Sequence, residues 1–446
     1  CPQHNFEEMY YYRWWSLRKH IKETPVGYGM TEFLVQRSYS DKYNLIACAI
    51  GHHIYESRWL RDPKYLDQII HTWYRGNDGG PMKKMDKFSS WNADAVLARY
   101  MVDGDKDYLL DMKKDLETEY QRWERTNRLK NGLYWQGDVQ DGMEESISGG
   151  RRKKYARPTI NSYMYGNAKA LSCIGILSGD EGMAMKYGMR ADTLKNLVEN
   201  ELWNTRHQFF ETMRTDSSAN VREAIGYIPW YFNLPDTTQK YEIAWKEIMD
   251  EKGFSAPYGL TTAERRHPEF RTRGVGKCEW DGAIWPFASA QTLTAMANFM
   301  NNYPQTVLSD SVYFRQMELY VESQYHRGRP YIGEYLDEVT GYWLKGDQER
   351  SRYYNHSTFN DLIITGLIGL RPRLDNTIEV NPLIPADKWD WFCLDNVLYH
   401  GHNLTILWDK NGDRYHCGKG LRIFVDGKEV GQANTLTKIV CENALK

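Results

Sequence analysis

The chain has 446 residues, a formal net charge of −2 and an aromatic content of 14%, with 16 Trp and 32 Tyr. A nucleic-acid partner would normally demand a basic surface, and this balance of charges argues against one. No run of about 18 apolar residues is present, so we expect no transmembrane segment. The length favours one large domain with a small second one.

Seven cysteines are dispersed along the chain, and none forms a CxxC pair. This pattern argues against a zinc site and against a dense disulfide scaffold. No HExxH motif and no EF-hand loop occurs, so we expect no catalytic metal and no dissociable cofactor. Cys1 leaves two interpretations open, a processed lipoprotein cysteine or an artificial boundary. We expect a periplasmic or secreted protein.

Helical hairpins dominate the first part of the chain. Between residues 160 and 177 apolar side chains recur at spacings of three and four, Gly179-Asp180 interrupts the pattern, and a second amphipathic run follows. Similar breaks occur at residues 61–63, 104–105 and 302–304. Stacked hairpins fit an open solenoid or a closed toroid. We predict a closed barrel of six hairpins, because the candidate catalytic residues lie in long turns that one barrel mouth would gather.

The first segment with candidate functional residues covers residues 135–146. It contains three candidate sugar-binding residues and two candidate acids, namely Trp135, Gln136, Asp138, Asp141 and Glu144. The Gly142-Met143 step permits a tight turn that orients neighbouring side chains. A solvated acidic loop is the alternative interpretation.

Two indoles flank an aspartate in the segment 280–287, as Trp280, Asp281 and Trp285. Aromatic faces stack on the C–H surfaces of sugars, and a carboxylate accepts hydrogen bonds from hydroxyl groups. The combination suits a carbohydrate ligand. The same residues would also fit a protein core at the start of a helix.

A third segment, residues 331–341, places Glu334 and Tyr335 between Gly333 and Gly341. Glycines in these positions are also typical of an ordinary surface turn. The functional interpretation of this segment therefore depends on the other two.

After residue 370 the pattern changes. Residues 377–380 and 404–408 are strand-like runs, and Asn-Gly and Asp-Gly turn signals occur within 409–413 and at 426–427. We predict a helical barrel domain over residues 1–370 and a small antiparallel β-domain over residues 371–446. We expect the role of the β-domain to be structural, and a carbohydrate-facing edge is the alternative.

The three acidic and aromatic segments follow the order of motifs in a known group of enzymes. The Trp-Asp…Trp-Pro pattern at residues 280–286 resembles the signature of trehalases and of the related glucosidase I and mannosylglycerate-hydrolase groups, which are inverting glycoside hydrolases with (α/α)6 barrels. The segment 135–146 resembles the Gly-Met/Trp-Asp-x-Ser motif of that family. Residues 334–341 resemble its Glu-x-Tyr-Asn/Asp-x-x-Thr-Gly motif, with the tyrosine displaced to Tyr335.

Position by position, the resemblance implies a general acid at Glu144 and a general base at Glu334. Glu144 departs from the family pattern because Glu replaces Asp, so Asp141 stays an alternative acid. The resemblance also implies an aromatic and polar wall beside the base, formed by His356 and Phe359 at the start of the final helix. A packing role is the alternative for His356.

These assignments predict hydrolysis of a glycosidic bond by a single displacement that inverts the anomeric configuration. The two carboxyl groups should lie about 6.5–9.5 Å apart, which leaves room for the attacking water. The pKa of the acid must be raised by burial and neighbouring carboxylates for it to donate a proton near neutral pH. We expect an oligosaccharide or polysaccharide as substrate, a role in its breakdown, and a monomeric protein.

Two other classes of function compete with hydrolysis. A polysaccharide lyase on a similar α/α toroid would use a Tyr or His base, with Arg or a metal neutralising a uronate. A non-catalytic carbohydrate-binding barrel would keep the tryptophan segment and lose one carboxylate. The two ordered acidic segments favour hydrolysis over both.

Overall fold

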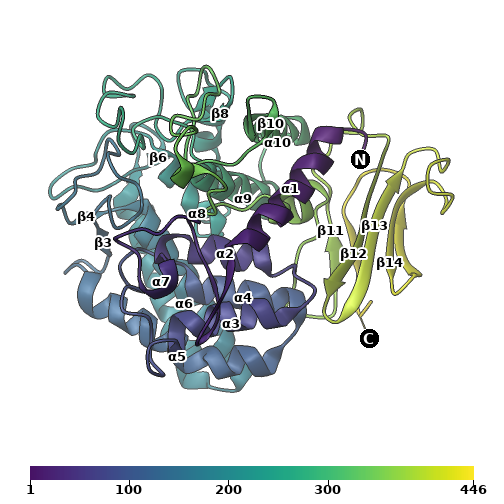
Figure 1. The fold of residues 1–446 in the computed structure, drawn as a ribbon, viewed down its shortest axis with the longest axis horizontal. Coiled ribbons are helices and arrows are strands. Elements are labelled where there is room, and N and C mark those ends of the chain that lie inside the picture. Colours follow the sequence, from purple (N-terminus) through teal and green to yellow (C-terminus); the bar gives the residue numbers. More distant parts are fainter. Residues whose placement is uncertain (446) are drawn as a thin grey trace.

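The computed structural model describes residues 1–445 as a helical body with a small β-sheet beside it (Figure 1). The longer helices are α1 (His4–His20), α2 (Ile50–Ser57), α3 (Pro63–Arg75), α4 (Asn92–Asp103), α5 (Lys106–Asn127), α6 (Pro158–Ser178), α7 (Glu181–Leu197), α9 (Pro286–Asn302) and α10 (Asp310–Ser323). The shorter helical segments are η1 (Lys42–Asn44), η2 (Ala47–Ala49), η3 (Val198–Leu202), η4 (Ala224–Tyr227), α8 (Ile228–Tyr231), η5 (Glu242–Ile248), η6 (Glu349–Ser351), α11 (Asn360–Leu362) and η7 (Ile363–Leu367). Among the described residues, no helix combines the length and the apolarity needed to cross a bilayer.

An inner ring of helices closes on itself. Going round the ring, α2 contacts α4, α4 contacts α6, α6 contacts α8, α8 contacts α9, α9 contacts α11, and α11 returns to α2. The outer partners of these helices are α3, α5, α7, η5, α10 and α1. The last pair joins the two ends of the barrel sequence, because α1 packs on α11. The predicted closed barrel of helical hairpins is therefore confirmed.

The residues at the helix ends explain where the hairpins turn. Asp62, Asp105 and Asp180 accept hydrogen bonds from backbone N–H groups in the first turns of α3, α5 and α7. Gly104 and Gly179 follow α4 and α6 with φ of 72° and 73°, a left-handed conformation that favours glycine. The turns predicted at residues 104–105 and 179–180 are confirmed.

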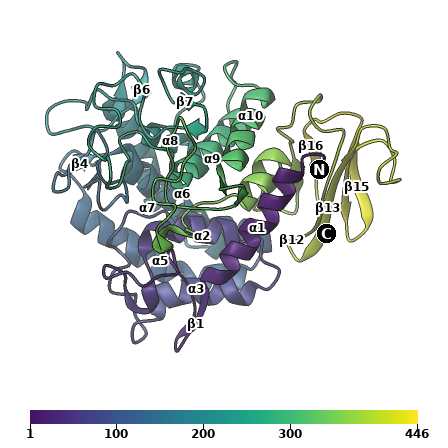
Figure 2. The same cartoon turned by 45° about the horizontal axis from the view of Figure 1, so that its top comes forward.

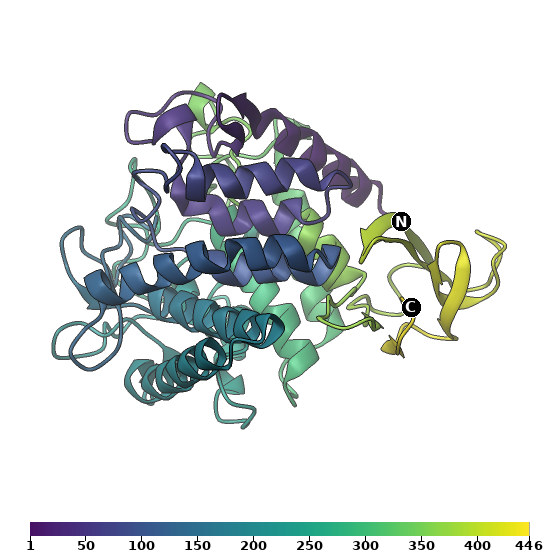
Figure 3. The ribbon, with the colours of Figure 1, turned by 90° about the horizontal axis from the view of Figure 1, so that it is seen from below.

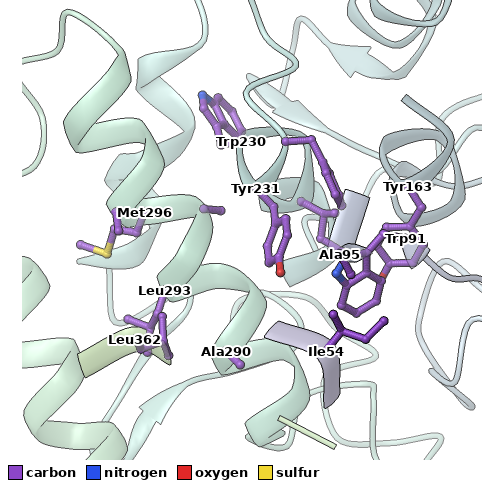
Figure 4. Close-up of a cluster of buried hydrophobic side chains, with 14 of the residues drawn as sticks. Ile54, Trp91, Ala95, Tyr163, Trp230, Tyr231, Ala290, Leu293, Met296 and Leu362 are labelled. Atoms are coloured by element: carbon purple, nitrogen blue, oxygen red, sulfur yellow. The ribbon is translucent and has the colours of Figure 1, made fainter. Parts of the chain in front are cut away.

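Side chains from the inner helices fill the middle of the barrel (Figure 4). The labelled residues come from α2, the start of α4, α6, α8, α9 and α11: Ile54, Trp91, Ala95, Tyr163, Trp230, Tyr231, Ala290, Leu293, Met296 and Leu362. Most are almost fully buried, and Trp91 packs on Tyr163 with ring centroids 4.7 Å apart. The barrel axis is therefore a packed core, and a ligand has to bind at one of its ends.

The two ends of the barrel carry connections of different length. The connections from an outer helix to the next inner helix are long, covering residues 21–49, 76–91, 128–157, 203–223, 249–285 and 324–359. The connections within a hairpin are short, such as residues 58–62, 104–105 and 179–180. Because the hairpins are antiparallel, all the long connections emerge at the same end. Figure 3 shows these loops at one end of the helical body, with the β-sheet at the other.

Short strand pairs stiffen the long connections. These pairs are β1 (Ile21–Thr24) with β2 (Gly27–Met30), β3 (Trp135–Gln136) with β4 (Tyr155–Ala156), β5 (Trp203–Asn204) with β6 (Phe209–Phe210), β7 (Ser255–Ala256) with β8 (Gly259–Leu260), and β9 (Tyr325–His326) with β10 (Arg329–Pro330). Each pair is antiparallel. The loops that hold the candidate catalytic residues are therefore folded back on themselves.

The C-terminal part is an antiparallel sheet packed beside the barrel (Figure 2). Its strands are β12 (Trp391–Tyr399), β13 (His402–Asp409), β14 (Gly420–Val425) and β15 (Lys428–Ala433), in that order, and β11 (Ile378–Val380) pairs with β16 (Ile439–Cys441). Trp389, just before β12, packs edge-on against Phe6 of α1 and Phe314 of α10. The predicted C-terminal β-structure is confirmed, and the exact domain boundary at residue 370 stays a prediction.

Candidate active site

Two of the three sequence segments lie side by side at the long-loop end of the barrel. Ile284 and Leu336 exchange two backbone hydrogen bonds of 3.0 Å, which join the tryptophan segment to the segment that contains Glu334. The hydroxyl group of Tyr335 also donates to the backbone oxygen of Lys277 at 2.5 Å. The loop before α9 and the loop before α11 are therefore fixed to each other.

Glu334 is buried with positive charge beside one of its oxygens. Only 4% of the residue is exposed. Its Oε2 lies 3.2 Å from Nη2 of Arg350 and 3.9 Å from Nζ of Lys345. The same oxygen has no hydrogen-bond partner among the described residues. Glu334 thus has unused capacity to accept a hydrogen bond from a ligand or a water molecule.

Glu144 lies on the segment 135–146 and is only partly buried. The pKa of its carboxyl group is raised to about 7, mainly by burial and also by the nearby charges of Glu334 and Asp138. The segments 135–146 and 331–341 are far apart in the sequence, yet their carboxyl groups are close enough for their charges to interact. The structure therefore combines the two acidic segments in one site.

Asp141 is held as an anchor of its loop. Its Oδ2 accepts hydrogen bonds from Nε of Arg157, at 2.6 Å, and from the hydroxyl group of Thr159. Its Oδ1 accepts from the hydroxyl group of Ser89 at 2.7 Å. The Asp141 and Arg157 side chains are both inaccessible to solvent. Both carboxylate oxygens of Asp141 are therefore engaged inside the protein, and its alternative role as general acid stays a prediction.

Gly142 makes the tight turn between Asp141, which anchors the loop, and Glu144. It has φ of 72°, and a Cβ atom at this position would lie 2.3 Å from Sγ of Cys48. A larger residue would have to push the loop away from η2, where Cys48 lies. The tight turn expected at Gly142-Met143 is therefore present, and it presses the loop against the first connection of the barrel.

The tryptophan segment forms a stack of three rings. Trp285 lies between Trp280 and Tyr335, with centroid distances of 4.4 Å and 4.5 Å and interplanar angles of 20° and 19°. Both faces of Trp285 are thus covered by protein, so the structure differs from the open stacking surface that we expected from the sequence. The Nε1 atoms of both tryptophans are buried without a partner among the described residues, and their edges can still donate hydrogen bonds.

Asp281 folds the loop in front of this stack. It is fully buried, and its Oδ2 accepts hydrogen bonds from the backbone N–H groups of Arg273 and Gly274 at 2.6 Å and 2.9 Å. Its Oδ1 has no partner within the described chain. The sequence led us to expect a carboxylate that accepts from sugar hydroxyls. In the structure at least half of that carboxylate organises the loop instead.

The remaining residues of the acidic loop have mixed roles. Trp135 is half-buried, and Nζ of Lys154 lies 4.3 Å above its ring. The Gln136 side chain donates to Ser89 and accepts from the backbone of Gly137, so it fixes the loop from inside. Asp138 accepts from the backbone N–H of Val139, and burial raises its pKa.

His356 and Phe359 are separated by the structure. His356 is fully enclosed, its ring centroid lies 3.8 Å from that of Tyr354 and 6.1 Å from that of Trp285, and neither ring nitrogen has a partner in the described part of the chain. Burial holds the pKa of its imidazole well below the usual range, so the ring is neutral. Phe359 instead packs in the core against Tyr320, and it does not form the expected wall beside Glu334.

Sequence reasoning missed Glu32, which follows β2. The residue is 4% exposed, and its Oε1 accepts a hydrogen bond of 2.6 Å from the hydroxyl group of Tyr354. Burial raises the pKa of Glu32 to about 8, with further contributions from the charges of Glu334 and Glu144. No motif or spacing marks Glu32 in the sequence, because Tyr354, Glu334 and Glu144 lie more than a hundred residues away.

Within residues 1–445, no group of three or more His, Cys, Asp or Glu side chains is placed to hold a metal ion. The site consists of three carboxyl groups, neutral imidazole and indole N–H groups, at the mouth of a closed helical barrel. This fold and site define the chain as a glycoside hydrolase. It belongs to the family described as the mannosylglycerate hydrolase MGH1-like glycoside hydrolase domain, whose model matches residues 42–357. The resemblance inferred from the sequence is thereby confirmed.

Other comparisons agree with the two-part architecture. Residues 370–431 match the C-terminal domain of glycosyl hydrolase family 65. A solved structure named "Sialidase" is 95% identical, with a TM-score of 0.99 over 100% of this chain. This chain spans only 41% of the length of that protein.

Two more distant structures share the fold alone. The GH63 mannosylglycerate hydrolase from Thermus thermophilus, in complex with glucose, is 13% identical with a TM-score of 0.60, covering 80% of this chain and 99% of that one. The GH78 family rhamnosidase of Bacillus sp. GL1 is 10% identical with a TM-score of 0.63, covering 95% of this chain and 41% of that one. In the second case the similarity extends over the sheet as well as the barrel.

Proposed function

We propose that the chain hydrolyses a glycosidic bond with inversion of configuration, with Glu144 as the general acid and Glu334 as the general base. The observation that supports this most is the contrast between the two environments. Glu144 has a pKa raised to about 7 and is accessible from the solvent. Glu334 is buried beside Arg350, and its Oε2 lacks a hydrogen bond from the described residues. Two carboxyl groups in such different surroundings suit one acid and one base.

In the proposed reaction the neutral carboxyl group of Glu144 gives its proton to the glycosidic oxygen as the bond from that oxygen to the anomeric carbon breaks. Glu334 takes a proton from a water molecule, and the oxygen of that water bonds to the anomeric carbon from the opposite face. The products are an alcohol and a free sugar of inverted configuration. Both protons are accounted for, because Glu144 ends as a carboxylate and Glu334 as a carboxylic acid.

Asp141 is a weaker choice for the acid. A general acid has to reach the leaving oxygen and has to hold a proton before the reaction. Arg157, Thr159 and Ser89 occupy the carboxylate oxygens of Asp141. We therefore assign the proton donation to Glu144.

The substrate we propose is an oligosaccharide or polysaccharide. Purified protein incubated with plant and host glycans should release a saturated sugar, and proton NMR of the first product should show the inverted anomer. A product that absorbs as an unsaturated uronate would indicate a lyase instead. Binding of glycans without any product would indicate a carbohydrate-binding barrel.

A further inference from the structure

The backbone around Glu32 is held rigidly next to the segment before α11. The N–H group of Asn355 donates to the backbone oxygen of Glu32 at 3.0 Å, and the Asn355 side chain donates to that of Thr31 at 3.1 Å. His20 contacts the hydroxyl group of Thr31 with one ring nitrogen and the backbone oxygen of Tyr353 with the other. Glu32 is therefore positioned by contacts on both sides.

The two oxygens of Glu32 have different surroundings. Oε1 accepts the hydroxyl proton of Tyr354, whereas Oε2 is buried and has no partner among residues 1–445. Buried polar atoms nearly always have a hydrogen-bond partner in the working protein. Several neighbouring polar groups share this condition, namely Glu334 Oε2, both ring nitrogens of His356, and Nε1 of Trp280 and Trp285. Several unused donors and acceptors in one site indicate a ligand with several hydroxyl groups.

The charges around Glu32 are mostly negative or neutral. The ionisable groups whose charges interact with it are those of Tyr39, Cys48, Glu144, Glu334 and Tyr354. The cations Arg350 and Lys345 lie against Glu334 instead, and the charge of Arg151 acts on Glu144. The charges of Glu334 and Glu144 disfavour the ionised form of Glu32. With a pKa of about 8, Glu32 keeps its proton at neutral pH, where Glu144, with a pKa of about 7, is protonated only in part.

The tyrosine decides which oxygen has the proton. Because Oε1 already accepts from Tyr354, the proton of a neutral Glu32 belongs on Oε2, the oxygen that no described residue contacts with a hydrogen bond. We propose that Oε2 of neutral Glu32 donates a hydrogen bond to a hydroxyl oxygen of the sugar in the reactive subsite, with Tyr354 as its positioning residue. This assignment rests on the proposed glycosidase function, since that function names the ligand as a sugar.

The first test needs no substrate. In protein labelled with 13C at the glutamate carboxyl carbons, the signal that disappears in Glu32→Gln should titrate near pH 8, and in Tyr354→Phe that signal should shift. A Glu32 signal that titrates below pH 5 would overturn the proposal, whatever sugar the protein cleaves. This measurement therefore tests the protonation of Glu32 independently of the proposed function.

The second test uses the glycan that the hydrolysis screen identifies, bound to the Glu334→Gln variant and measured by calorimetry. Adding Glu32→Gln should leave the dissociation constant within about threefold, because an amide N–H replaces the O–H. Adding Glu32→Ala should raise it about 10- to 100-fold, the usual range for losing a buried hydrogen bond. Equal binding by the Ala and Gln variants would overturn the proposal and indicate that only water fills the space beside Oε2.

The pH dependence of sugar binding tests whether Glu32 donates the hydrogen bond. With Glu32 present the dissociation constant should be flat below pH 7 and rise above about pH 8, as the donor proton is lost. In the Glu32→Gln variant the rise should disappear, because the amide does not titrate. A rise that persists in that variant would contradict the assignment.

Glu8→Gln is the matched control for these measurements. Glu8 also accepts from a tyrosine, Tyr325, but on the exposed surface of α1. This variant should therefore keep both the affinity and its pH dependence. If the screen finds no cleaved glycan, the proposed function fails while the NMR arm still decides the state of Glu32.

Discussion

At the scale of single residues, Glu334 has the features of a group that acts on water. It is buried, it has Arg350 at 3.2 Å, and its Oε2 accepts no hydrogen bond from the described residues. Glu334→Gln preserves the shape of the side chain but cannot accept the proton of water. We expect kcat to fall about 10²- to 10⁴-fold while substrate affinity changes only a few-fold.

Steady-state kinetics together with calorimetric affinity would check this prediction. Asp347→Asn is a suitable control, because Asp347 lies in the same connection but its side chain is 58% exposed and pairs with Arg327. A control variant that loses as much activity as Glu334→Gln would show that the whole connection had been disturbed.

Glu144 should determine the alkaline side of the pH profile. Its pKa is raised to about 7, mainly by burial, so the carboxyl group is protonated below that pH and loses its proton above it. Activity should therefore fall as the pH rises through about 7 in the free enzyme. Glu144→Gln should remove this limb and should impair alkyl glycosides far more than aryl glycosides, whose leaving groups need little protonation. If Asp141→Asn gave that leaving-group dependence and Glu144→Gln did not, the acid would be Asp141.

At the scale of elements, the acidic loop depends on one buried ion pair. Asp141 of the loop and Arg157 before α6 are both inaccessible to solvent, with 2.6 Å between Oδ2 and Nε. Asp141→Ala leaves the guanidinium without its partner, and we expect a loss of about 3–5 kcal/mol in the free energy of unfolding. Urea denaturation would measure it.

The same loop contains an exposed ion pair that serves as the control. Glu145 lies 2.9 Å from Arg151, whose side chain is 61% exposed. Glu145→Ala should cost no more than about 1 kcal/mol, because solvent screens an exposed pair. Similar losses of unfolding free energy in both variants would mean that burial does not make the Asp141–Arg157 pair more stabilising than the exposed pair.

At the scale of the whole molecule, one tryptophan connects the C-terminal β-structure to helices α1 and α10 of the barrel. Trp389 packs on Phe6 and Phe314, and its Nε1 donates to the side chain of Gln3 at 2.6 Å. Trp389→Ala should lower the free energy of unfolding by about 3–5 kcal/mol. It should loosen α1 first, because Phe6 lies in that helix and Gln3 directly precedes it. Hydrogen exchange of the α1 amides, with urea denaturation, would check both parts.

Trp391 is the control for this prediction. It lies two residues further on, is only half-buried, and contacts Arg414 at 4.2 Å. Trp391→Ala should therefore leave α1 exchange unchanged. Faster exchange in α1 for both variants would argue against a specific connection through Trp389.

The sequence by itself determined the local elements and the order of the chemistry. Apolar spacing and Asp or Gly at the turns predicted the hairpin of α6 and α7, because helix periodicity and capping depend on neighbours a few residues apart. The Asn-Gly and Asp-Gly turns predicted the C-terminal strands for the same reason. The motifs around Glu144, Trp280 and Glu334 indicated the family, since a motif is a short-range pattern.

Only the tertiary structure decided which of these residues share a site. Glu32 meets Tyr354 across 322 positions of the chain, and no local pattern records such a contact. The covered faces of Trp285 and the anchored carboxylate of Asp141 likewise depend on Tyr335 and Arg157, which other segments supply. The packing of α1 against α11 also brings the first and last helices of the barrel together. Burial and long-range contact, which set the pKa values and the free hydrogen-bonding atoms, exist only once the chain has folded.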